Sequence, residues 1–594
     1  MLLNVPAKGN LHQEGFNKHV LEDGRTCLIW AKGYFFDSTG RMRYGEEIVD
    51  WLAMQLAGVK ELPVLVPEMN GCFSVIVVWP EVNVVEVGID RFGTIPIYYH
   101  TGDDNLIVSD DFWRIADRLS GREYDPDAVL SMVFLGYVTG YRTLLKDITE
   151  LRQASMHRFS FAADVPELTS QRYWMLSYRT SPQRQPKVWR EELARTLDAV
   201  FARHAQAVLD RGWEVHIPLS GGKDSRLLAG ILNRNGAPVQ AFSYGPAGNE
   251  ETHYASQVAN ALSIPFRSVR VDEPSFLKPS FIQTMTRRVG MRARFTAGLG
   301  AQLSLSAGPQ TDDETDVYVP GHVGDTLTSG DLSRGEFLVR SEAQAVQHLI
   351  NGYSLLIPGE IGAALFPRAW TPASTRRVIL TGWHFDALNP LSSLYRWHHQ
   401  NANRRKYLTE LRTYERFGHW MLPYYDYDLF EFFTRVPPEL LYRQRLYVDT
   451  LIHRIFVDDL SVLSRIPIAY KGNLQVPSLS RRDRAAMSTL PPLLSDWILR
   501  RATNSKRREH LRTVGMRSSK PSGPDPLDHW WCDYPGFRES VIDSFRDWDG
   551  MKGIVDASAL IGILQEPLPR LFIQFAVPGL LTLRYFQQIV EDEL

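Results

Sequence analysis

The stretch Ile217–Leu232 constrains the fold of this chain more than any other. It reads IPLSGGKDSRLLAGIL, an apolar run that breaks at Ser220, Gly221 and Gly222 and then resumes as an apolar, helix-forming sequence. A strand followed by a glycine turn and the first turn of a helix exposes backbone N–H groups, and the helix dipole attracts negative charge there. The stretch therefore predicts an α/β domain with an anion-binding turn, to which Ser220 and Ser225 add hydroxyl groups.

Asp224 is the unusual member of this turn, because a carboxylate beside bound phosphates would repel them. A cation between the two groups removes the repulsion, and carboxylate oxygens of this kind favour Mg²⁺. Lys223 either adds positive charge to the same site or points to solvent, and the sequence leaves both alternatives open. The G-x-x-x-x-G-K-[ST] pattern of Walker loops is absent.

The pattern around this turn indicates a parallel sheet, because short apolar segments alternate with helical ones. The predicted strands are WEVHIPL, PVQAFSY, FRSVRV and the start of DVYVPGHVGD, and the predicted helices are 187–211, DSRLLAGILNRNG and EETHYASQVANAL. Residues 330–470 are expected to be mostly helical. The segments ALIGILQ and LLTLRYFQQIV are expected to be helices that pack on the same domain.

The N-terminal part is instead rich in short β-branched runs such as GCFSVIVVW and VNVVEVGI, which predict strands. The polar, proline-containing linker SPQRQP at 181–186 separates the two parts. The sequence therefore predicts domains at 1–180 and 187–594. A polar, basic segment at 504–526 is expected to be mobile, either as a lid that excludes water or as a partner-docking loop.

Composition argues against several classes of function. The chain of 594 residues has 66 Lys and Arg against 68 Asp and Glu, so no basic excess favours nucleic acid as a partner. No apolar run approaches the roughly 18 residues of a membrane helix. Its three cysteines, Cys27, Cys72 and Cys532, lack the spacing of a metal site or a disulfide framework. Without a signal-peptide pattern at the start, a cytoplasmic location is expected.

The SGGKDS turn resembles the SGGxDS loop of the PP-loop ATP pyrophosphatases, which grip the pyrophosphate end of ATP and cut between its α- and β-phosphates. The whole chain is similar to the asparagine-synthetase-like family, in which a class II glutamine-amidotransferase domain precedes a synthetase domain. The segments that carry this resemblance are NGCFSVIVVW, GIDRFGTIPIYYH, QRYW, AFSYGPAGNEETHYASQVANALSIP, PGHVGDTLTSG, LPYYDYDLFEFFTRVPPEL and RIPIAYKGN.

The resemblance implies a fold and a set of site residues. The first domain would be an Ntn-type αββα sandwich, and the second an adenine-nucleotide α-hydrolase-like parallel-sheet domain with helical additions. Asp224 and Asp325 would hold Mg²⁺, and Lys471 would stabilise the transferring phosphate and the adenylate unless it is a solvated surface lysine. The residues expected at ATP are Leu219, Ser220, Gly221, Gly222, Asp224, Ser225, Ser243, Tyr244 and Gly321.

The chain departs from the family pattern near its N-terminus. Glutamine-using members carry an N-terminal cysteine there as nucleophile, whereas position 2 of this chain is Leu2. Cys27 cannot replace that cysteine, because the chemistry uses the chain's own terminal amine as base. The resemblance therefore implies a glutaminase-deficient member, similar to the β-lactam synthetases and lasso-peptide cyclases, in which an amine of the substrate attacks the adenylate.

A second departure is His322, three residues before Asp325. Asparagine synthetases have Glu there, and β-lactam synthetases have a Tyr that works with a Glu as base. A histidine can deprotonate an amine near neutral pH, with Glu410 or Glu415 as the partner carboxylate, although a hydrogen-bonded loop histidine and a solvated glutamate remain alternatives. A third departure is Thr326, where the family usually has Glu.

The predicted activity is that of an amide-bond-forming ligase that uses Mg²⁺ and ATP, adenylates a carboxylate and releases AMP and pyrophosphate. In one variant the carboxylate is amidated with ammonia, as is presumed for the surface-polysaccharide homologues that parts of the sequence resemble. In the other, a substrate amine forms a lactam, a lasso-peptide macrolactam or a substituted amide. A nucleotide-binding subunit without turnover is the alternative outside catalysis.

The expected partners follow from this activity. They are a small-molecule or peptide carboxylate and an amine or ammonia donor, with no nucleic acid and no membrane. A homodimer is allowed by the resemblance.

Overall fold

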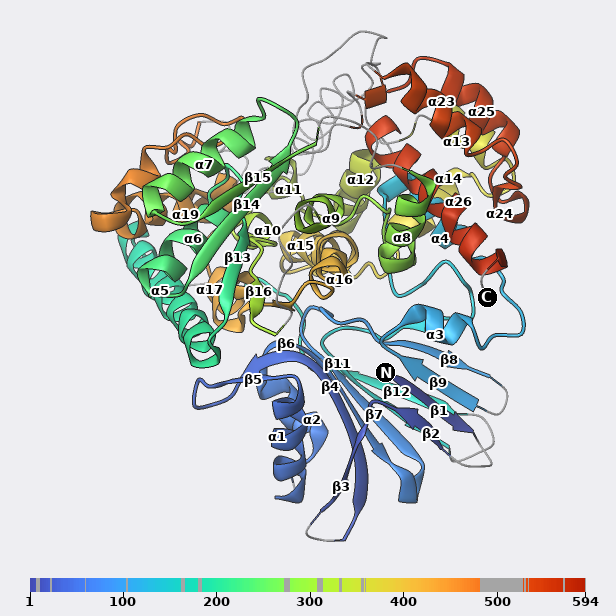
Figure 1. Cartoon of the computed structure of the whole chain (residues 1–594), viewed down its shortest axis with the longest axis horizontal. Coiled ribbons are helices and arrows are strands. Elements are labelled where there is room, and N and C mark those ends of the chain that lie inside the picture. The colour runs from blue at the N-terminus through green and yellow to red at the C-terminus, as the bar shows by residue number, and fades with distance from the viewer. Residues whose placement is uncertain are drawn as a thin grey trace. The chain divides into compact units, whose positions relative to one another are not determined.

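The computed structural model in Figure 1 gives the arrangement of helices and strands along the chain. The residues that it describes are 1–6, 11–21, 24–58, 60–102, 105–161, 166–179, 184–271, 278–306, 314–330, 334–353, 357, 359–480, 527, 530–531, 534–569 and 572–592. The segment 504–526, predicted to be a lid or a docking loop, lies outside these residues, as does Cys532.

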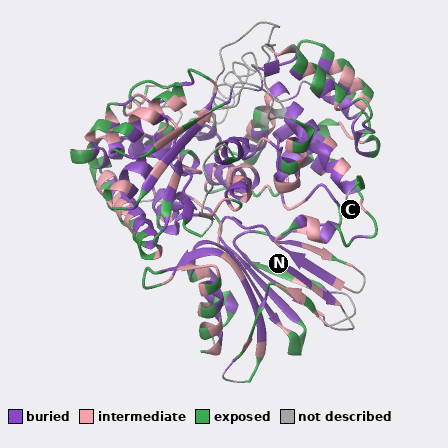
Figure 2. Cartoon of the chain, viewed as in Figure 1, coloured by how far each residue is buried: buried purple, intermediate pink, exposed green. Residues whose placement is uncertain are grey.

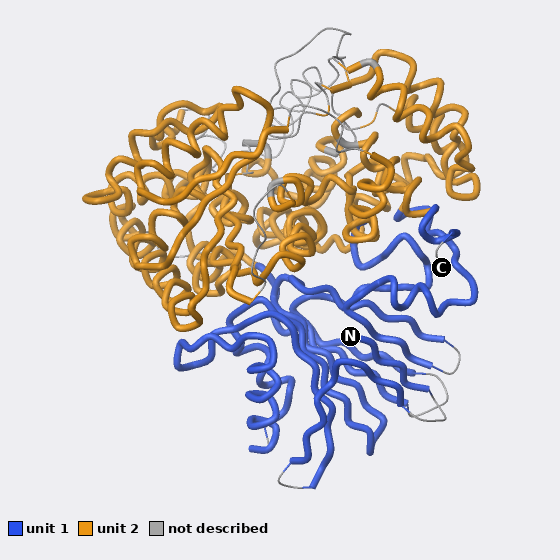
Figure 3. Tube along the Cα trace, viewed as in Figure 1, with its two compact units in different colours: residues 1–128, 138–176, 588–594 blue, residues 129–137, 177–587 orange. Residues whose placement is uncertain are grey.

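The chain divides into two compact units, which Figure 3 shows in different colours. Unit 1 comprises Met1–Ala128, Val138–Leu176 and Gln588–Leu594, and unit 2 comprises Val129–Tyr137 and Ser177–Gln587. The boundary between Leu176 and Ser177 lies just before the predicted linker at 181–186, so the units differ from the predicted domains 1–180 and 187–594 at this boundary and in two further segments. Val129–Tyr137 belongs to the second unit, and Gln588–Leu594 belongs to the first.

Unit 1 is built on two antiparallel sheets, as its β-branched runs predict. Its strands are β1 Leu2–Pro6, β2 His12–Glu14, β3 Asn17–Val20, β4 Thr26–Phe36, β5 Met42–Tyr44, β6 Asn70–Trp79, β7 Val84–Ile89, β8 Tyr98–Thr101, β9 Asn105–Ser109, β10 Thr149–Glu150, β11 Ser155–Ser160 and β12 Glu167–Arg172. One sheet has the order β12-β11-β7-β6-β4-β3, with β5 paired to β4, and the other has the order β10-β8-β9-β1-β2.

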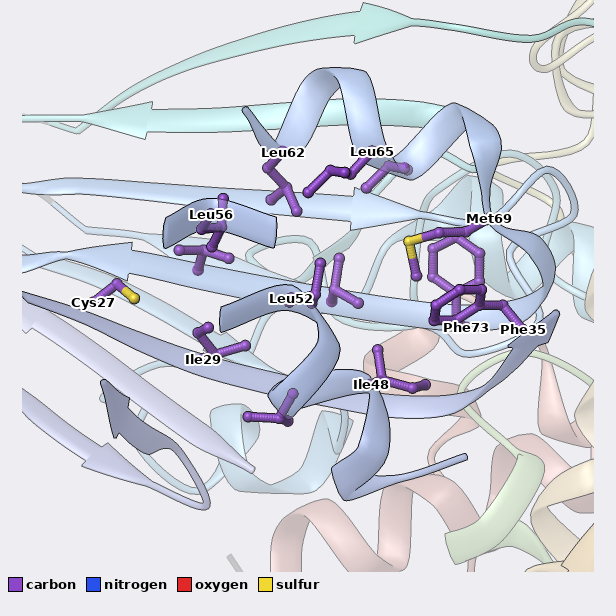
Figure 4. Close-up of a cluster of buried hydrophobic side chains, with 14 of the residues drawn as sticks. Cys27, Ile29, Phe35, Ile48, Leu52, Leu56, Leu62, Leu65, Met69 and Phe73 are labelled. Atoms are coloured by element: carbon purple, nitrogen blue, oxygen red, sulfur yellow. The ribbon is translucent and has the colours of Figure 1, made fainter. Parts of the chain in front are cut away.

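The core of unit 1 lies between the larger sheet and its helices α1 (Glu46–Ala57) and α2 (Leu62–Leu65). Ile48, Leu52 and Leu56 recur at helical spacing on α1 and point to the sheet in Figure 4. The opposite face of this sheet meets the smaller sheet, because the rings of Tyr99 on β8 and Phe159 on β11 lie 5.5 Å apart between centroids. A short helix, α3 (Phe112–Ala116), follows β9.

Unit 2 contains a parallel sheet, which confirms the prediction from alternating strands and helices. Its strands are β13 Glu214–Pro218, β14 Val239–Gly245, β15 Phe266–Arg270, β16 Asp316–Tyr318 and β17 His419–Trp420. The order is β15-β14-β13-β16-β17, and every neighbouring pair is parallel. Figure 2 shows β14 as largely buried, and Val215 and Ile217 of β13 are buried as well, in keeping with their apolar sequences.

The strand order creates a site for ligands. The chain leaves β13 on one side to form β14 and β15, and then crosses to the other side to form β16 and β17. The connections on the two sides of β13 therefore run in opposite directions. In open parallel sheets, ligands bind in the crevice at the carboxyl ends of the strands where the order reverses, which here is between β13 and β16.

Helices of unit 2 flank the sheet and fill the segments between and after its strands, as predicted for 330–470. They are α4 Pro126–Leu135, which begins in unit 1, α5 Pro186–Arg211, α6 Asp224–Arg234, α7 Glu250–Leu262, α8 Pro279–Val289, α9 Leu299–Ser306, α10 Gly324–Leu327, α11 Arg334–Phe337, α12 Glu342–Tyr353, α13 Gly359–Leu365, α14 Pro372–Ile379, α15 Pro390–His398, α16 Leu411–Tyr414, α17 Tyr427–Phe433, α18 Pro438–Leu441, α19 Arg445–Thr450, α23 Pro535–Asp543, α24 Gly550–Gly553, α25 Ala557–Gln565 and α26 Val577–Asp592. Within the described ranges, no helix combines the length and apolar character needed to cross a bilayer.

Candidate active site

The glycine turn of the sequence is a loop at the carboxyl end of the central strand β13. This glycine loop, Leu219–Lys223, joins β13 to α6, as the strand–turn–helix pattern predicts. Two serines hold it together: the Ser220 N–H donates to Ser225 Oγ at 3.1 Å, and the Gly222 N–H donates to Ser220 Oγ at 3.2 Å. The hydroxyl oxygens of Ser220 and Ser225 lie 3.1 Å apart.

A cavity of about 300 Å³ opens where the strand order reverses. The ends of β13 and β14, the segment after β16 and the helical segment around Glu410 supply its walls. It is lined by Pro218, Leu219, Ser220, Asp224, Ser225, Phe242, Ser243, Tyr244, Glu251, Pro320, Gly321, His322, Val323, Asp325, Thr326, Tyr407, Glu410 and Tyr414. The structure thus brings together most of the residues predicted from the sequence.

The two glycines of the loop do not line this cavity, although both were expected at ATP. At Gly221, a Cβ atom would lie 2.8 Å from the Cβ of Ala469 and 3.3 Å from the Cα of Glu251. The missing side chain therefore lets the loop pack against α7 and the turn that carries Ala469. At Gly222, a Cβ would lie 3.0 Å from Ser220 Oγ.

Asp224 and Asp325 both line the cavity, and Lys223 connects them. Lys223 Nζ lies 2.8 Å from Asp325 Oδ1 and 3.8 Å from Asp224 Oδ2. The Lys223 side chain is only 7% exposed, so it does not point to solvent. Gln444 Nε2 also donates to Asp325 Oδ1, at 3.2 Å.

The neighbours of Asp224 fix its position. Gly324 makes room for its carboxylate, because a Cβ on Gly324 would lie 2.8 Å from Asp224 Cγ. Tyr424 donates its hydroxyl to the backbone oxygen of Asp224 at 3.0 Å, and the hydroxyl of Tyr447 lies 3.0 Å from that of Tyr424. Burial raises the pKa of Asp224 to about 7, with Lys223 acting to lower that pKa and Asp325 to raise it.

The two carboxylates fit a divalent cation. Asp224 Oδ1 is buried and has no hydrogen-bond partner among the described residues. A carboxylate with an elevated pKa and an unpaired oxygen gains from a cation ligand. For Asp325, burial acts to raise the pKa, but the charge and hydrogen bond of Lys223 outweigh it and hold the pKa below its usual value.

A second polar group in the cavity is the pair His322 and Glu410. His322 Nε2 lies 3.2 Å from Glu410 Oε2, and the Tyr414 hydroxyl donates to Glu410 Oε1 at 3.0 Å. Burial acts to raise the pKa of Glu410, but the charge and hydrogen bond of His322 lower it below its usual value. Of the two glutamates weighed from the sequence, Glu410 is therefore the one beside His322.

Glu415 has a different environment. It lies outside the cavity lining, accepts a hydrogen bond from Trp420 Nε1 at 3.2 Å, and has Oε1 2.7 Å from Arg412 Nη2. Glu415 is therefore not the partner of His322. Its contacts with Arg412 and Trp420 instead connect α16 to β17.

An irregular helix places Glu410. Residues His399–Tyr407 form a π-helix and Leu408–Glu410 a 3₁₀ turn, before α16 resumes regular geometry. Such departures from the α-helix change which side chains share a face, and they are frequent at functional sites. In the segment after β16, Val323 has a φ of 70° in the left-handed region that β-branched residues rarely adopt. This turn lies between His322 and Asp325, both of which line the cavity.

Lys471 lies in a turn beside the glycine loop. The turn is closed by a bond from the Ile468 N–H to the Gly472 oxygen at 2.7 Å and is joined to the loop by a bond from the Ala469 N–H to the Gly221 oxygen at 3.2 Å. Lys471 is exposed and does not line the cavity. Burial raises the pKa of Glu251, and the charge of Lys471 opposes that rise; the same charge helps to lower the pKa of Asp325.

Comparison with known proteins agrees with this arrangement. Residues 192–411 match the asparagine synthase family model. The match supports an asparagine synthetase-like family and spans the glycine loop, both cavity aspartates, His322 and Glu410. Lys471 lies beyond the matched residues. No curated protein matches the chain.

Two solved structures show weak likeness. One is described as glutamine phosphoribosylpyrophosphate (PRPP) amidotransferase from B. subtilis complexed with ADP and GMP; it is 10% identical, with a TM-score of 0.18, over 43% of this chain and 73% of that chain. The other is described as the allosteric regulatory enzyme of purine biosynthesis; it is 11% identical, with a TM-score of 0.16, over 53% of this chain and 58% of that chain. At these TM-scores the likeness establishes no common fold.

Several residues of the candidate site were not predicted from the sequence. Glu251 follows the predicted strand PVQAFSY and begins the next helix, a position that sequence reasoning could have marked as the same sheet edge. No such signal marks Tyr407 and Tyr414. The sequence does not show that a π-helix follows α15, so it does not show which way these two side chains point. The sequence leaves the direction of the Lys223 side chain open and does not predict that it lies beside both aspartates.

Proposed function

We propose that this chain is an ATP-dependent ligase that forms an amide bond. It adenylates a carboxylate substrate with release of pyrophosphate, and then transfers the acyl group to an amine or ammonia with release of AMP. One observation carries the proposal: a single cavity joins the glycine loop, the carboxylate pair Asp224–Asp325 and the pair His322–Glu410. The first two groups suit a nucleotide polyphosphate with its cation, and the third suits proton removal from an amine.

The phosphate side of the cavity prepares the first half-reaction. The hydroxyls of Ser220 and Ser225 and the start of α6 bind phosphate oxygens at the end of β13. Asp224 and Asp325 would hold Mg²⁺, which neutralises charge on the phosphates when it is bound. Ser243 and Tyr244 at the end of β14 extend this wall for the rest of the nucleotide. Lys471 acts on the same phosphates from the rim when its flexible side chain turns inward.

The base side of the cavity serves the second half-reaction. The amine nitrogen attacks the acyl carbon of the adenylate, the C–N bond forms, and the bond from that carbon to the phosphate oxygen breaks. The electron pair leaves with AMP, and the proton of the amine passes to His322. Glu410 stabilises the imidazolium, and Tyr414 orients Glu410 through its hydrogen bond.

We further propose that glutamine is not the nitrogen source. Leu2 is buried in β1, between β2 and β9, and an aliphatic side chain supplies no nucleophile. Cys27 and Cys72 are also buried. Ammonia and a substrate amine both remain acceptors under this proposal, so that amidation and intramolecular cyclisation are its two forms.

Pyrophosphate release from Mg-ATP tests the proposal with a panel of carboxylates: aspartate, uronic acids, β-amino acids and Asp-containing peptides. Each is assayed without added amine, with ammonia and with glutamine. Release that depends on one carboxylate and is indifferent to glutamine supports the proposal and gives the substrate class. Stimulation by glutamine contradicts the assignment at Leu2. ATP binding without release from any carboxylate favours a nucleotide-binding subunit.

Two glutamate variants test the base. Glu410→Gln should retain carboxylate-dependent exchange of labelled pyrophosphate into ATP but should lose most of the roughly 10²–10⁴-fold that a general base contributes to amide formation, because the imidazolium of His322 is then no longer stabilised. Glu415→Gln is the matched control, because Glu415 lies outside the cavity lining. Equal losses in the two variants would remove His322–Glu410 from the mechanism.

A further inference from the structure

Lys223 lies in the space that a cation shared by the two cavity aspartates would need. Its ammonium is 2.8 Å from Asp325 Oδ1 and 3.8 Å from Asp224 Oδ2, and its side chain is 7% exposed. Mg²⁺ binds carboxylate oxygens at about 2.0–2.1 Å and requires a nearly octahedral shell of oxygens. An ammonium hydrogen-bonded to Asp325 and close to Asp224 occupies part of that shell on Asp325 and repels the incoming positive charge.

The surroundings of Lys223 agree with a counter-ion role. Asp224 and Asp325 line the same cavity as the carboxyl groups of Glu251 and Glu410, so Lys223 offsets negative charge in this cavity. Gln444 also donates to Asp325 Oδ1, but an amide brings no charge. Asp224 Oδ1 remains buried without a hydrogen-bond partner among the described residues, which leaves it available to a cation.

We propose that Lys223 is a built-in counter-ion that competes with the divalent cation for Asp224 and Asp325 and is displaced when the cation binds. The inference rests on the proposed function, in which these aspartates hold the metal. Lys223 belongs to the glycine loop, so the displaced ammonium can turn to the phosphate oxygens of a nucleotide bound there. Metal binding is therefore weak without nucleotide and strong with it.

The test measures Mn²⁺ binding to the full chain by electron paramagnetic resonance, without nucleotide and with the α,β-methylene analogue of ATP. Lys223→Met keeps an unbranched side chain that is one heavy atom shorter and removes its charge, and Lys223→Arg keeps the charge. Without nucleotide, Lys223→Met should bind Mn²⁺ at least tenfold more tightly than wild type, and Lys223→Arg should not. The tightening of Mn²⁺ binding by the nucleotide should shrink in Lys223→Met.

Equal or weaker Mn²⁺ binding by Lys223→Met would overturn the inference. Asp325→Asn separates this failure from a failure of the proposed function. If Asp325→Asn leaves Mn²⁺ binding unchanged, the metal assignment of the proposed function is wrong and the inference falls with it. If Asp325→Asn weakens Mn²⁺ binding but Lys223→Met does not strengthen it, only the inference about Lys223 is wrong. Thermal melts of each variant confirm that the chain is folded.

Discussion

Replacing Arg226 with Met should weaken the attachment of the turn that contains Lys471 to the glycine loop. Arg226 lies on α6, and its side chain is fully buried. Its guanidinium donates to four backbone oxygens that belong to the glycine loop and to the segment before Lys471. These bonds are to Leu463 and Ile466 at 2.7 Å each, Pro467 at 2.9 Å and Gly221 at 3.3 Å.

The size of the effect follows from what the substitution leaves behind. A buried carbonyl without a donor costs about 1–3 kcal/mol. Water can reach the half-buried Pro467, and the bond to Gly221 is long, so the loss falls mainly on Leu463 and Ile466. Burial lowers the pKa of Arg226 to about 10, which shows that its charge is costly to bury. An uncharged Met does not have this cost, so part of the loss is offset. We expect the local opening of 463–472 to become easier by about 3–5 kcal/mol, or roughly 10²–10⁴-fold.

Amide hydrogen exchange on the full chain measures this opening. The reporters are the bonded N–H groups of Ile468, Ala469, Lys471 and Gly472. Arg234→Met on the same helix is the control. Arg234 is 32% exposed, and its ion pair with Asp198 at 2.7 Å lies at the surface, so its loss should cost at most about 1 kcal/mol. Exchange in Arg226→Met within tenfold of wild type would refute the reasoning, because the four bonds would then not hold the turn.

Three further predictions concern the carboxylate site. Asp224→Asn should abolish pyrophosphate release yet retain metal-free nucleotide binding in calorimetry, whereas an inactive binding subunit would lose only affinity for the metal–nucleotide complex. Burial raises the pKa of Asp224 in the folded chain from 3.8 to about 7, so stability due to this group is present below about pH 4 and lost as the pH rises through 7. Without metal, Asp224→Asn should therefore melt above wild type at pH 8 and not at pH 4, and equal melting at pH 8 would contradict the shift. Gly324→Ala would place a Cβ 2.8 Å from Asp224 Cγ and should weaken Mn²⁺ binding and cost about 1–3 kcal/mol in stability, whereas Gly352→Ala, with nothing within 4 Å, should do neither.

Local sequence signals predicted the elements that position the phosphate side of the cavity. The helix predicted from EETHYASQVANAL coincides with α7, Glu250–Leu262. Asn249 begins it, because its side chain accepts from the N–H groups of Glu251 and Thr252 at 2.7 and 3.3 Å. The glycine loop between β13 and α6 was predicted for the same reason, since each of its determinants lies within a few residues in the chain.

The base side of the cavity could not be predicted in this way. Glu410 and Glu415 are both plausible partners of His322 in a regular helix, and the sequence does not show that a π-helix precedes them. The left-handed Val323 is equally hidden, because a valine normally argues against that backbone conformation. Both features depend on tertiary packing that overrides local preference.

The directions of long flexible side chains could not be predicted from the sequence either. Lys223 could have pointed to solvent, but its ammonium is held by two carboxylates that lie about a hundred residues apart in the chain. Lys471 was expected at the phosphates from the family resemblance, and its turn does lie against the glycine loop, yet its side chain is exposed. The backbone position was therefore predictable, whereas the direction of the side chain depends on charges that only the folded chain brings together.

The separation of the two sides of the cavity has a mechanistic consequence. The glycine loop and Asp224 come from the end of β13, His322 and Asp325 share the segment after β16, and Glu410 comes from a 3₁₀ turn. Glu410, which stabilises the protonated base, is thus held by a different segment from the groups that make the adenylate. A change at Glu410 can then spare the first half-reaction, whereas a change at Asp224 removes both, because no acyl group reaches the base without the adenylate.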